Sequence, residues 1–136
     1  MNEEIGFELY LNQPYDQSVI LVTEALKSEG FGVLTFIDVR ETLQNKLGEE
    51  FRPYVIIGAC NPPLAHKALS QDPRVGLMLP CNITVEAVEE VGSIVRIANP
   101  EMMMKIGSLE SNKIMREVAK EARIHLERVI KHLDTK

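Results

Sequence analysis

The chain has 136 residues, with 15 Lys and Arg against 20 Asp and Glu, and it carries a formal net charge of -5 at pH 7. This acidic balance argues against non-specific nucleic-acid binding, which needs a basic face. With 45% hydrophobic and 26% charged residues, the composition is that of one globular domain, 1–136, which is large enough to bury a core without disulfides or metals.

No secretion or membrane signal is visible. The N-terminal segment is acidic and lacks the basic start and apolar core of a secretory signal. The apolar runs are too short to span a bilayer. We therefore expect a cytoplasmic protein that does not insert into membranes, and in that compartment both cysteines are reduced.

The N-terminal part of the chain alternates between strand and helix patterns. Apolar residues at every second position predict a strand over 5–11. Apolar residues at helical spacing predict a helix over 15–29 that ends at Gly30, and a further apolar run predicts a strand over 31–37.

A short helix is expected after this second strand. Asp38, followed three residues later by Glu41, has the spacing of a capping box. Leu43 and Leu47 lie four residues apart and define the expected buried side of the helix. Gly48 ends it.

The segment 51–82 holds both cysteines. Residues 54–57 form a short β-branched run typical of a buried strand. Asn61 followed by proline predicts the start of a helix over 62–71. The apolar run 75–79 predicts another strand.

Both of these predicted strands end in a cysteine followed by an asparagine. A crossover helix usually makes the strands that it joins parallel, which would place both Cys-Asn pairs at the same carboxyl edge of the sheet. Ligands favour that edge in open α/β sheets. We therefore expect a small-molecule or anion pocket formed by Gly58, Ala59, Cys60, Asn61, Pro80, Cys81 and Asn82.

A thiol- or metal-dependent enzyme is the alternative interpretation. Cys60 precedes a helix N-terminus, whose dipole lowers a thiol pKa, so it is a candidate nucleophile or metal ligand. Cys81 would be the resolving partner or second ligand, and His66 the base or third ligand. Packed, inert cysteines are the commoner outcome, because unpaired cysteine is among the most buried residue types. The sequence does not indicate which cofactor, if any, the protein binds.

The C-terminal part predicts a hairpin followed by a short turn. Strands are expected over 83–88 and 93–97, joined by 89–92 with its glycine at a position that needs a positive φ. Asn99 followed by proline opens a turn that holds three methionines, 102–104, which we interpret as flexible core filler.

The last predicted helix, 110–133, has the most regular apolar stripe in the chain. The stripe residues are three or four positions apart: Met115, Val118, Ala122, Leu126, Val129 and Leu133. His125 and His132 lie seven residues apart, about 10 Å along the helix axis. That separation is too large for the two rings to bind one metal ion together.

Several segments in this order resemble the domain-of-unknown-function family 302. They are ALKSEGFGVLTFIDV, FRPYVIIGACNPPLAHKAL, GLMLPCN and NPEMMM. The resemblance covers nearly the whole chain, from Tyr10 to the C-terminal helix. It implies a small bacterial or archaeal α+β domain of the TT-type two-layer fold with no established activity, so it transfers no catalytic residue.

Together these elements predict an α+β, two-layer sandwich. We expect a mixed β-sheet of about six strands with helices packed on it, and the long C-terminal helix covering one face. A sheet face or helix side left partly apolar would favour a homodimer.

Overall fold

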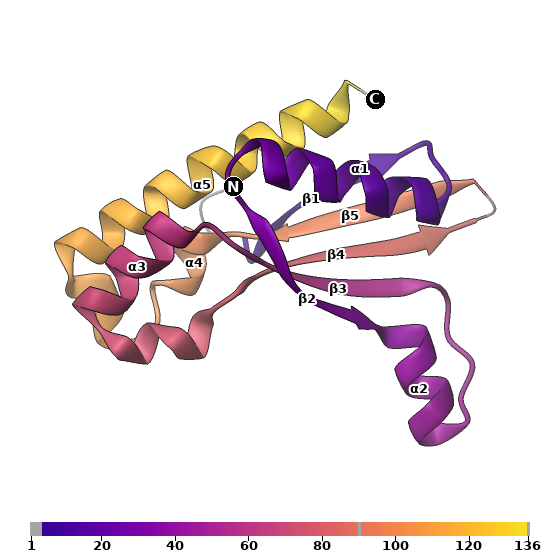
Figure 1. Ribbon diagram of the computed structural model, residues 1–136, viewed down its shortest axis with the longest axis horizontal. Coiled ribbons are helices and arrows are strands. Elements are labelled where there is room, and N and C mark those ends of the chain that lie inside the picture. The colour runs from indigo at the N-terminus through magenta and orange to yellow at the C-terminus, as the bar shows by residue number, and fades with distance from the viewer. Residues whose placement is uncertain (1–3, 90, 136) are drawn as a thin grey trace.

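The computed structural model describes residues 4–89 and 91–135. The two long helices, α1 (Tyr15–Ser28) and α5 (Lys113–Asp134), lie on one side of a β-sheet (Figure 1). The elements in chain order are β1 (Gly6–Leu11), α1 (Tyr15–Ser28), β2 (Gly32–Asp38), α2 (Val39–Leu47), β3 (Tyr54–Cys60), α3 (Pro62–Gln71), the 3-10 helix η1 (Pro73–Met78), β4 (Cys81–Val88), β5 (Gly92–Ala98), α4 (Pro100–Met103), the 3-10 helix η2 (Gly107–Ser111) and α5 (Lys113–Asp134).

The strands of the described residues form one five-stranded sheet in the order β1-β5-β4-β3-β2. Every neighbouring pair is antiparallel. The α+β class and the long C-terminal helix are confirmed. The expectation of a mixed sheet of about six strands is wrong, because one predicted strand is a helix and the remaining strands pair without parallel neighbours.

The strand predicted over 75–79 is the one that is missing. Pro73–Met78 form η1, which begins where the Asp72 side chain accepts a hydrogen bond from the Arg74 N–H at 3.0 Å. Aspartate followed by proline is a helix-start signal, and a five-residue apolar run does not by itself distinguish a strand from a helix. Leu77 is 87% exposed, which a buried strand would not allow.

The helices before and after β3 in the chain, α2 and α3, connect antiparallel neighbouring strands and are not crossovers between parallel strands. β2, β3 and β4 are successive neighbours, so α2 and α3 return the chain beside the strand that it has just left. α1 instead carries the chain from β1 at one edge of the sheet to β2 at the other.

The main core lies between the sheet and two helices. α1 and the C-terminal half of α5 pack on one face of the sheet (Figure 1). Because side chains alternate along a strand, every second residue of the inner strands is buried against these helices. Fully buried side chains include Val22, Leu26, Val55, Ile57, Ile83, Val85, Val95, Ile97, Leu126 and Leu133.

A second core forms where α5 extends beyond the sheet. The N-terminal half of α5 packs there against α3, α4 and η2, and η1 packs against α3. The buried residues of this cluster are Leu64, Ala68, Val75, Met104, Leu109, Met115, Val118, Ala119 and Ala122. The predicted stripe of α5 is therefore confirmed as its buried side, and it serves both cores.

Asparagine side chains cap the N-termini of three helices in this second core. Asn61, Asn99 and Asn112 accept hydrogen bonds from backbone N–H groups at the starts of α3, α4 and α5. The cap at Asn112 explains why α5 begins at Lys113 instead of the expected Glu110.

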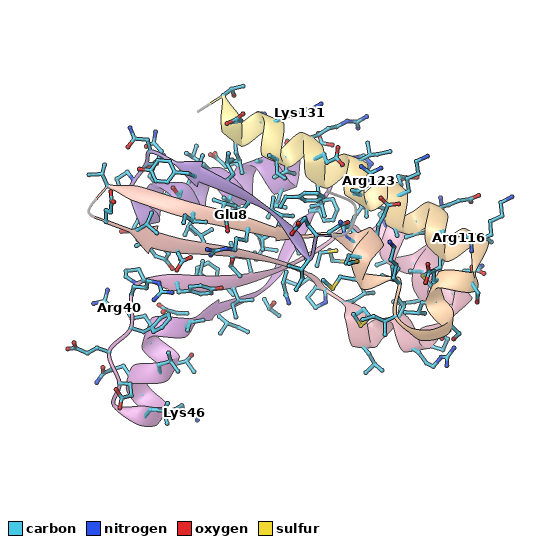
Figure 2. All side chains as sticks on the ribbon, turned by 180° about the vertical axis from the view of Figure 1, so that it is seen from behind. Glu8, Arg40, Lys46, Arg116, Arg123 and Lys131 are labelled. Carbon is cyan, nitrogen blue, oxygen red and sulfur yellow. The ribbon has the colours of Figure 1, made fainter. Side chains whose placement is uncertain are left out.

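Ion pairs add to the contact between α4 and α5. Arg123, labelled in Figure 2, pairs with Glu101 on α4 and with Glu127 one turn along α5. Charged residues such as these occupy the outer side of α5. Within residues 4–89 and 91–135, none of the helices combines the length and apolar character that crossing a bilayer demands.

α2 has its predicted caps but not its predicted burial. Asp38 Oδ1 accepts the Glu41 N–H at 3.0 Å, and Gly48 follows the helix with a φ of 68°. No residue of α2 is buried, and Leu47 is 67% exposed, so the expected buried side at Leu43 and Leu47 is wrong. A cap depends on adjacent residues, whereas burial needs a packing partner, and α2 projects away from the sheet (Figure 1).

The hairpin between β4 and β5 is confirmed, but its glycine has a different role. The positive φ of the turn, 57°, lies at Glu89, and Glu90 lies outside the described residues. Gly92 has no positive φ; it leaves room for the Tyr10 ring on β1, whose hydroxyl oxygen would lie 2.4 Å from a Cβ at this position. The predicted positive φ at Gly92 is therefore wrong.

Leu126→Ala is expected to lower the free energy of unfolding by about 2–5 kcal/mol, because it opens a cavity between α5 and the sheet. Urea denaturation followed by circular dichroism measures the change. Ile124→Ala on the exposed side of the same helix is the matched control, with an expected change below about 1 kcal/mol. Equal losses in the two variants would contradict the assignment of the inner side of α5.

Candidate functional site

The structure brings the two cysteine segments together, but not in the predicted way. In the β3–β4 pair, Gly58 lies opposite Asn82 and Ala59 lies opposite Cys81. The strands are antiparallel, so the end of β3 meets the beginning of β4, and Cys81 starts a strand instead of ending one. The predicted shared carboxyl edge is wrong, although the segments do adjoin.

Two residues of the predicted pocket have structural roles. A Cβ at Gly58 would lie 2.1 Å from Thr35 Oγ1 and 2.7 Å from Pro80 Cγ, so protein side chains already fill that space. Asn61 accepts the Leu64 N–H at 3.3 Å and thereby caps α3. Neither residue is left available to a ligand through these groups.

Cys60 and Cys81 are free, half-buried thiols. The void that both of them line has a volume of about 40 Å³, room for about one water molecule. Burial raises the pKa of the Cys60 thiol, and burial together with the neighbouring Cys60 raises the pKa of Cys81 to about 11. This direction is opposite to the lowered pKa expected at Cys60, because burial disfavours the charged thiolate.

His66 does not join the two cysteines. It is exposed on α3. Among the described residues, no three His, Cys, Asp or Glu side chains are grouped so that they could hold a metal ion, so the predicted set of Cys60, His66 and Cys81 does not form. Elsewhere, His125 Nδ1 lies 2.9 Å from Glu29 Oε1.

A larger cavity opens on the sheet face opposite α1 and α5, which we call the open face. Its volume is about 680 Å³, and β1, β4, β5, η1 and α4 all contribute to its walls. Of the predicted pocket residues, Pro80, Cys81 and Asn82 line this cavity. Gly58, Ala59, Cys60 and Asn61 do not, so the predicted pocket is only partly assembled.

The side walls of the open-face cavity are apolar, and its floor is polar. The walls come from η1, the turn after it and α4, which supply Leu77, Met78, Leu79, Pro100, Met103 and Met104. Thr84 and Arg96 lie opposite each other in the β4–β5 pair and also line the cavity. Sequence reasoning missed both, because on an amphipathic strand they look like ordinary solvent-facing residues.

Thr84 carries an unusual hydroxyl group. In the part of the chain that the structure describes, its Oγ1 is the buried side-chain polar atom without a hydrogen-bond partner. Buried polar groups are normally paired, and leaving one unpaired costs about 1–3 kcal/mol. The oxygen is closed off from the cavity in this structure, so a bound molecule that displaces the neighbouring side chains and hydrogen-bonds this hydroxyl would recover that cost.

A carboxylate is buried between two arginines on the same face. Glu86 is 5% exposed; its Oε2 accepts from Arg52 Nε at 2.5 Å and its Oε1 accepts from Arg96. Arg96 also donates to Glu8, labelled in Figure 2, at 2.7 Å. The two carboxylates and the two guanidinium groups of this network neutralise one another, so the network gives the cavity floor no net charge.

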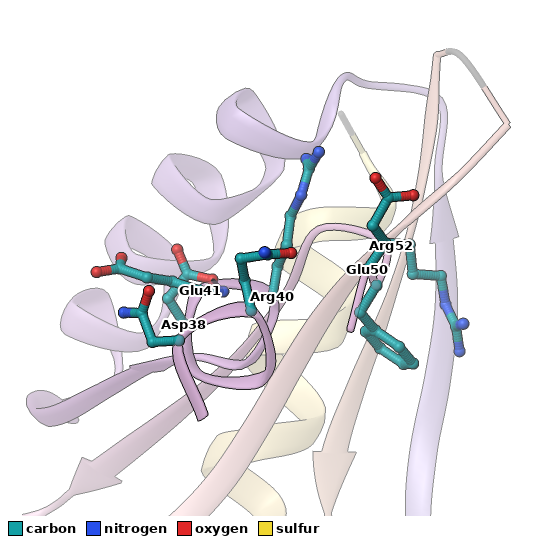
Figure 3. A pocket seen from close by; sticks show the side chains of 8 residues that line it. Asp38, Arg40, Glu41, Glu50 and Arg52 are labelled. Atoms are coloured by element: carbon teal, nitrogen blue, oxygen red, sulfur yellow. Dashed lines mark hydrogen bonds between the residues drawn. The ribbon is translucent and has the colours of Figure 1, made fainter. Parts of the chain in front are cut away.

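A second hollow, of about 650 Å³, lies between α2 and the segment before β3 (Figure 3). Asp38, Arg40 and Glu41 border one side, and Glu50 and Arg52 border the other. The walls mix positive and negative charge. None of its described lining residues carries a buried, unpaired polar atom, so its walls contain no polar group that a ligand would need to satisfy.

Glu86 is expected to make stability depend on acid pH. Burial alone would raise its pKa, but hydrogen bonds from Arg96 and Arg52 outweigh burial and lower it. A carboxylate with a lowered folded-state pKa contributes stability above its unfolded value, about 4.3, and loses that contribution as the pH falls through the folded value. We therefore expect the free energy of unfolding to fall below about pH 4.5.

Glu86→Gln tests this assignment by urea denaturation over the same pH range. It is expected to flatten the acid dependence and to cost about 1–3 kcal/mol at neutral pH. Glu8→Gln, at the exposed end of the same network, is the control and should cost about 0–1 kcal/mol. An unchanged pH profile in the Glu86 variant would refute the role given to this carboxylate.

Both thiols are expected to react slowly in the native protein. At pH 8 a thiol with a pKa of about 11 is ionised only to about a thousandth, so iodoacetamide should label Cys81 roughly a hundredfold more slowly than in the unfolded chain. Cys60 should also react more slowly than when unfolded. Peptide mass spectrometry over time assigns each rate, and native labelling of Cys60 at the unfolded rate would contradict the raised pKa.

Comparison with known proteins places the chain in a family. No curated protein matches it. A crystal structure of an uncharacterised conserved DUF302 protein from Bacillus stearothermophilus is similar, with 28% sequence identity, a TM-score of 0.80 and 96% of each chain covered. The model of the domain of unknown function DUF302 matches residues 7–133. The chain therefore belongs to the DUF302 family.

Proposed function

We propose that this protein is a small-molecule-binding domain whose ligand occupies the open-face cavity. The observation that carries the proposal is the buried, unpaired Thr84 hydroxyl in a cavity of about 680 Å³. Ligand pockets commonly have volumes of about 300–1,000 Å³, apolar walls and a few polar groups that orient the ligand. The open-face cavity has each of these properties.

The walls favour a ligand that is largely apolar. Proline, leucine and methionine side chains from η1, α4 and the turn before β4 surround the cavity. Methionine is flexible and polarisable, so Met103 and Met104 would adapt to ligands of different shape. Burial of an apolar ligand against these side chains supplies most of the binding free energy.

The floor favours one hydrogen-bonding group on that ligand. Thr84 offers a hydroxyl that can donate or accept, and Asn82 offers an exposed amide at the cavity. Arg96 already pairs with Glu86 and Glu8, so an anionic ligand would have to compete with two carboxylates. A neutral or weakly polar group at Thr84 therefore fits better than a strongly anionic one.

Two alternative functions have less support. The predicted anion pocket included Gly58, whose open side is filled by protein side chains, and Asn61, whose side chain caps α3. A thiol-dependent enzyme needs an accessible thiolate, and burial raises the pKa of both Cys60 and Cys81. Binding on the open face needs neither.

Nile red is a suitable probe, because it is neutral and its fluorescence rises when its apolar rings leave water. We expect saturable binding of about one probe per chain. Ala98→Leu adds bulk to the cavity wall on β5 and is expected to weaken binding about tenfold, or about 1.4 kcal/mol.

Two controls locate the bound probe. Gln44→Leu in the hollow beside α2 and Leu34→Lys on the exposed strand β2 should leave the affinity unchanged. Circular dichroism and thermal unfolding establish that each variant is folded. If a folded Ala98→Leu protein binds the probe as tightly as the original, the cavity is not the binding site.

Thr84→Val is expected to increase the stability of the protein and to weaken its binding of the probe. Removal of an unpaired buried hydroxyl should raise the free energy of unfolding by about 1 kcal/mol, while the affinity for the probe should fall about fivefold because the carbonyl oxygen of Nile red loses a hydrogen-bond donor. Thr84→Ser keeps the hydroxyl and is the matched control. A loss of stability in Thr84→Val would show that the hydroxyl is paired within the protein.

A further inference from the structure

The edge strand β2 is exposed over its whole length. All seven of its residues are exposed, including Leu34 at 66% and Phe36 at 56%. Val33 and Phe36 pair with Ala59 and Ile57, whose side chains face α1 and α5, while Ile37 pairs with Ile56 on the open face. Apolar side chains are therefore exposed on both faces of this strand.

The opposite edge of the sheet is protected in a way that β2 is not. On β1, Phe7 and Leu11 are buried under the helices, and Glu8 places a charged side chain on the open face. β2 has no charged residue before Asp38 and carries only a bulge near Leu34. Natural edge strands usually carry charges, prolines or covers that prevent pairing with another chain, so the unprotected β2 indicates that a partner covers it.

α2 continues this exposed surface beyond the sheet. It follows β2 directly, has no buried residue and carries Leu47 at 67% exposure. Lys46, labelled in Figure 2, lies near the end of this arm, away from the sheet. We call β2 and α2 together the exposed arm.

The area of the exposed arm is sufficient for association of two copies. Its exposed large apolar side chains are Val33, Leu34, Phe36, Ile37 and Leu47. They present on the order of 500 Å² per chain, so two copies together bury ~1,000 Å², the lower limit for a specific interface. This area per chain is comparable to the largest apolar patch that a typical monomer exposes, and such patches often mark an interaction site.

The charges of β2 suit a second copy of the same strand. In an antiparallel pair about a two-fold axis, one residue lies opposite its own copy, and the same surface serves both chains. With the axis at Thr35, Phe36 or Ile37, Asp38 lies opposite Gly32, Leu34 or Phe36 respectively. None of these is charged, so no like charges meet.

We propose that two copies of this chain associate through the exposed arm, with β2 of one copy antiparallel to β2 of the other and α2 extending over the partner. This joins the two sheets into one and gives the outward N–H and C=O groups of β2 hydrogen-bond partners. Phe36 and Leu34 are then covered at the junction. The inference is independent of the open-face cavity, which shares no lining residue with the arm.

Sedimentation velocity over a wide range of protein concentrations tests the proposal. The original chain should sediment as a dimer that dissociates on dilution. The double variant Leu34→Lys with Phe36→Lys should raise the dissociation constant at least about thirtyfold, the effect of losing interface anchors. Both side chains are exposed in the single chain, so the variant should keep its circular dichroism spectrum and fold.

A matched control and a local measurement make the test specific. Ile106→Lys replaces another exposed apolar residue far from the arm in sequence and should leave the dimer intact. Hydrogen exchange of the 32–38 segment should be slow in the dimer and fast in the double variant. A monomer at every concentration, a dimer that survives the double variant, or a dimer with fast exchange at 32–38 would each overturn the proposal.

Discussion

The packing of α5 along its apolar stripe is the interaction on which the other parts of the structure depend. Its N-terminal half closes the core with α3 and α4, and its C-terminal half joins α1 over the sheet. One continuous helix therefore fixes α3, α4 and η1 relative to the strands. The walls of the open-face cavity come from that helical group and its floor comes from the sheet, so the cavity exists because α5 holds the two together.

The width of two helices explains why parts of the sheet remain exposed. Two helices packed side by side cover about 20 Å, which corresponds to about four strands at a spacing of about 4.8 Å. α1 and α5 bury the helix-side residues of β1, β5, β4 and β3, and β2 is left over. With both long helices on one face, residues such as Thr84 and Glu86 on the other face have only local neighbours to satisfy them.

Local signals in the sequence predicted the fold better than long-range ones did. The caps at Asp38, Asn61 and Asn99 depend on adjacent residues, the stripe of α5 depends on residues three or four positions apart, and each is found as predicted. The strand predicted over 75–79, the parallel arrangement of the cysteine segments and the burial of α2 all required knowledge of tertiary neighbours. Cys60 and Cys81 became neighbours through antiparallel pairing, which the connection by a helix concealed.

The cavity floor could not have been recognised from the sequence for a related reason. On an antiparallel sheet with one covered face, alternate residues of β4 and β5 point away from the core whether or not anything lies above them. Thr84 differs from an ordinary surface threonine because its hydroxyl is buried without a hydrogen-bond partner beside a cavity whose walls include Met103, Met104 and Pro80. Those residues come from segments up to 20 positions away along the chain, and the packing of α4 against α5 and of η1 against α3 brings them to the strand. The property that makes this threonine a candidate for ligand binding therefore belongs to the assembled fold, and the sequence of β4 alone does not contain it.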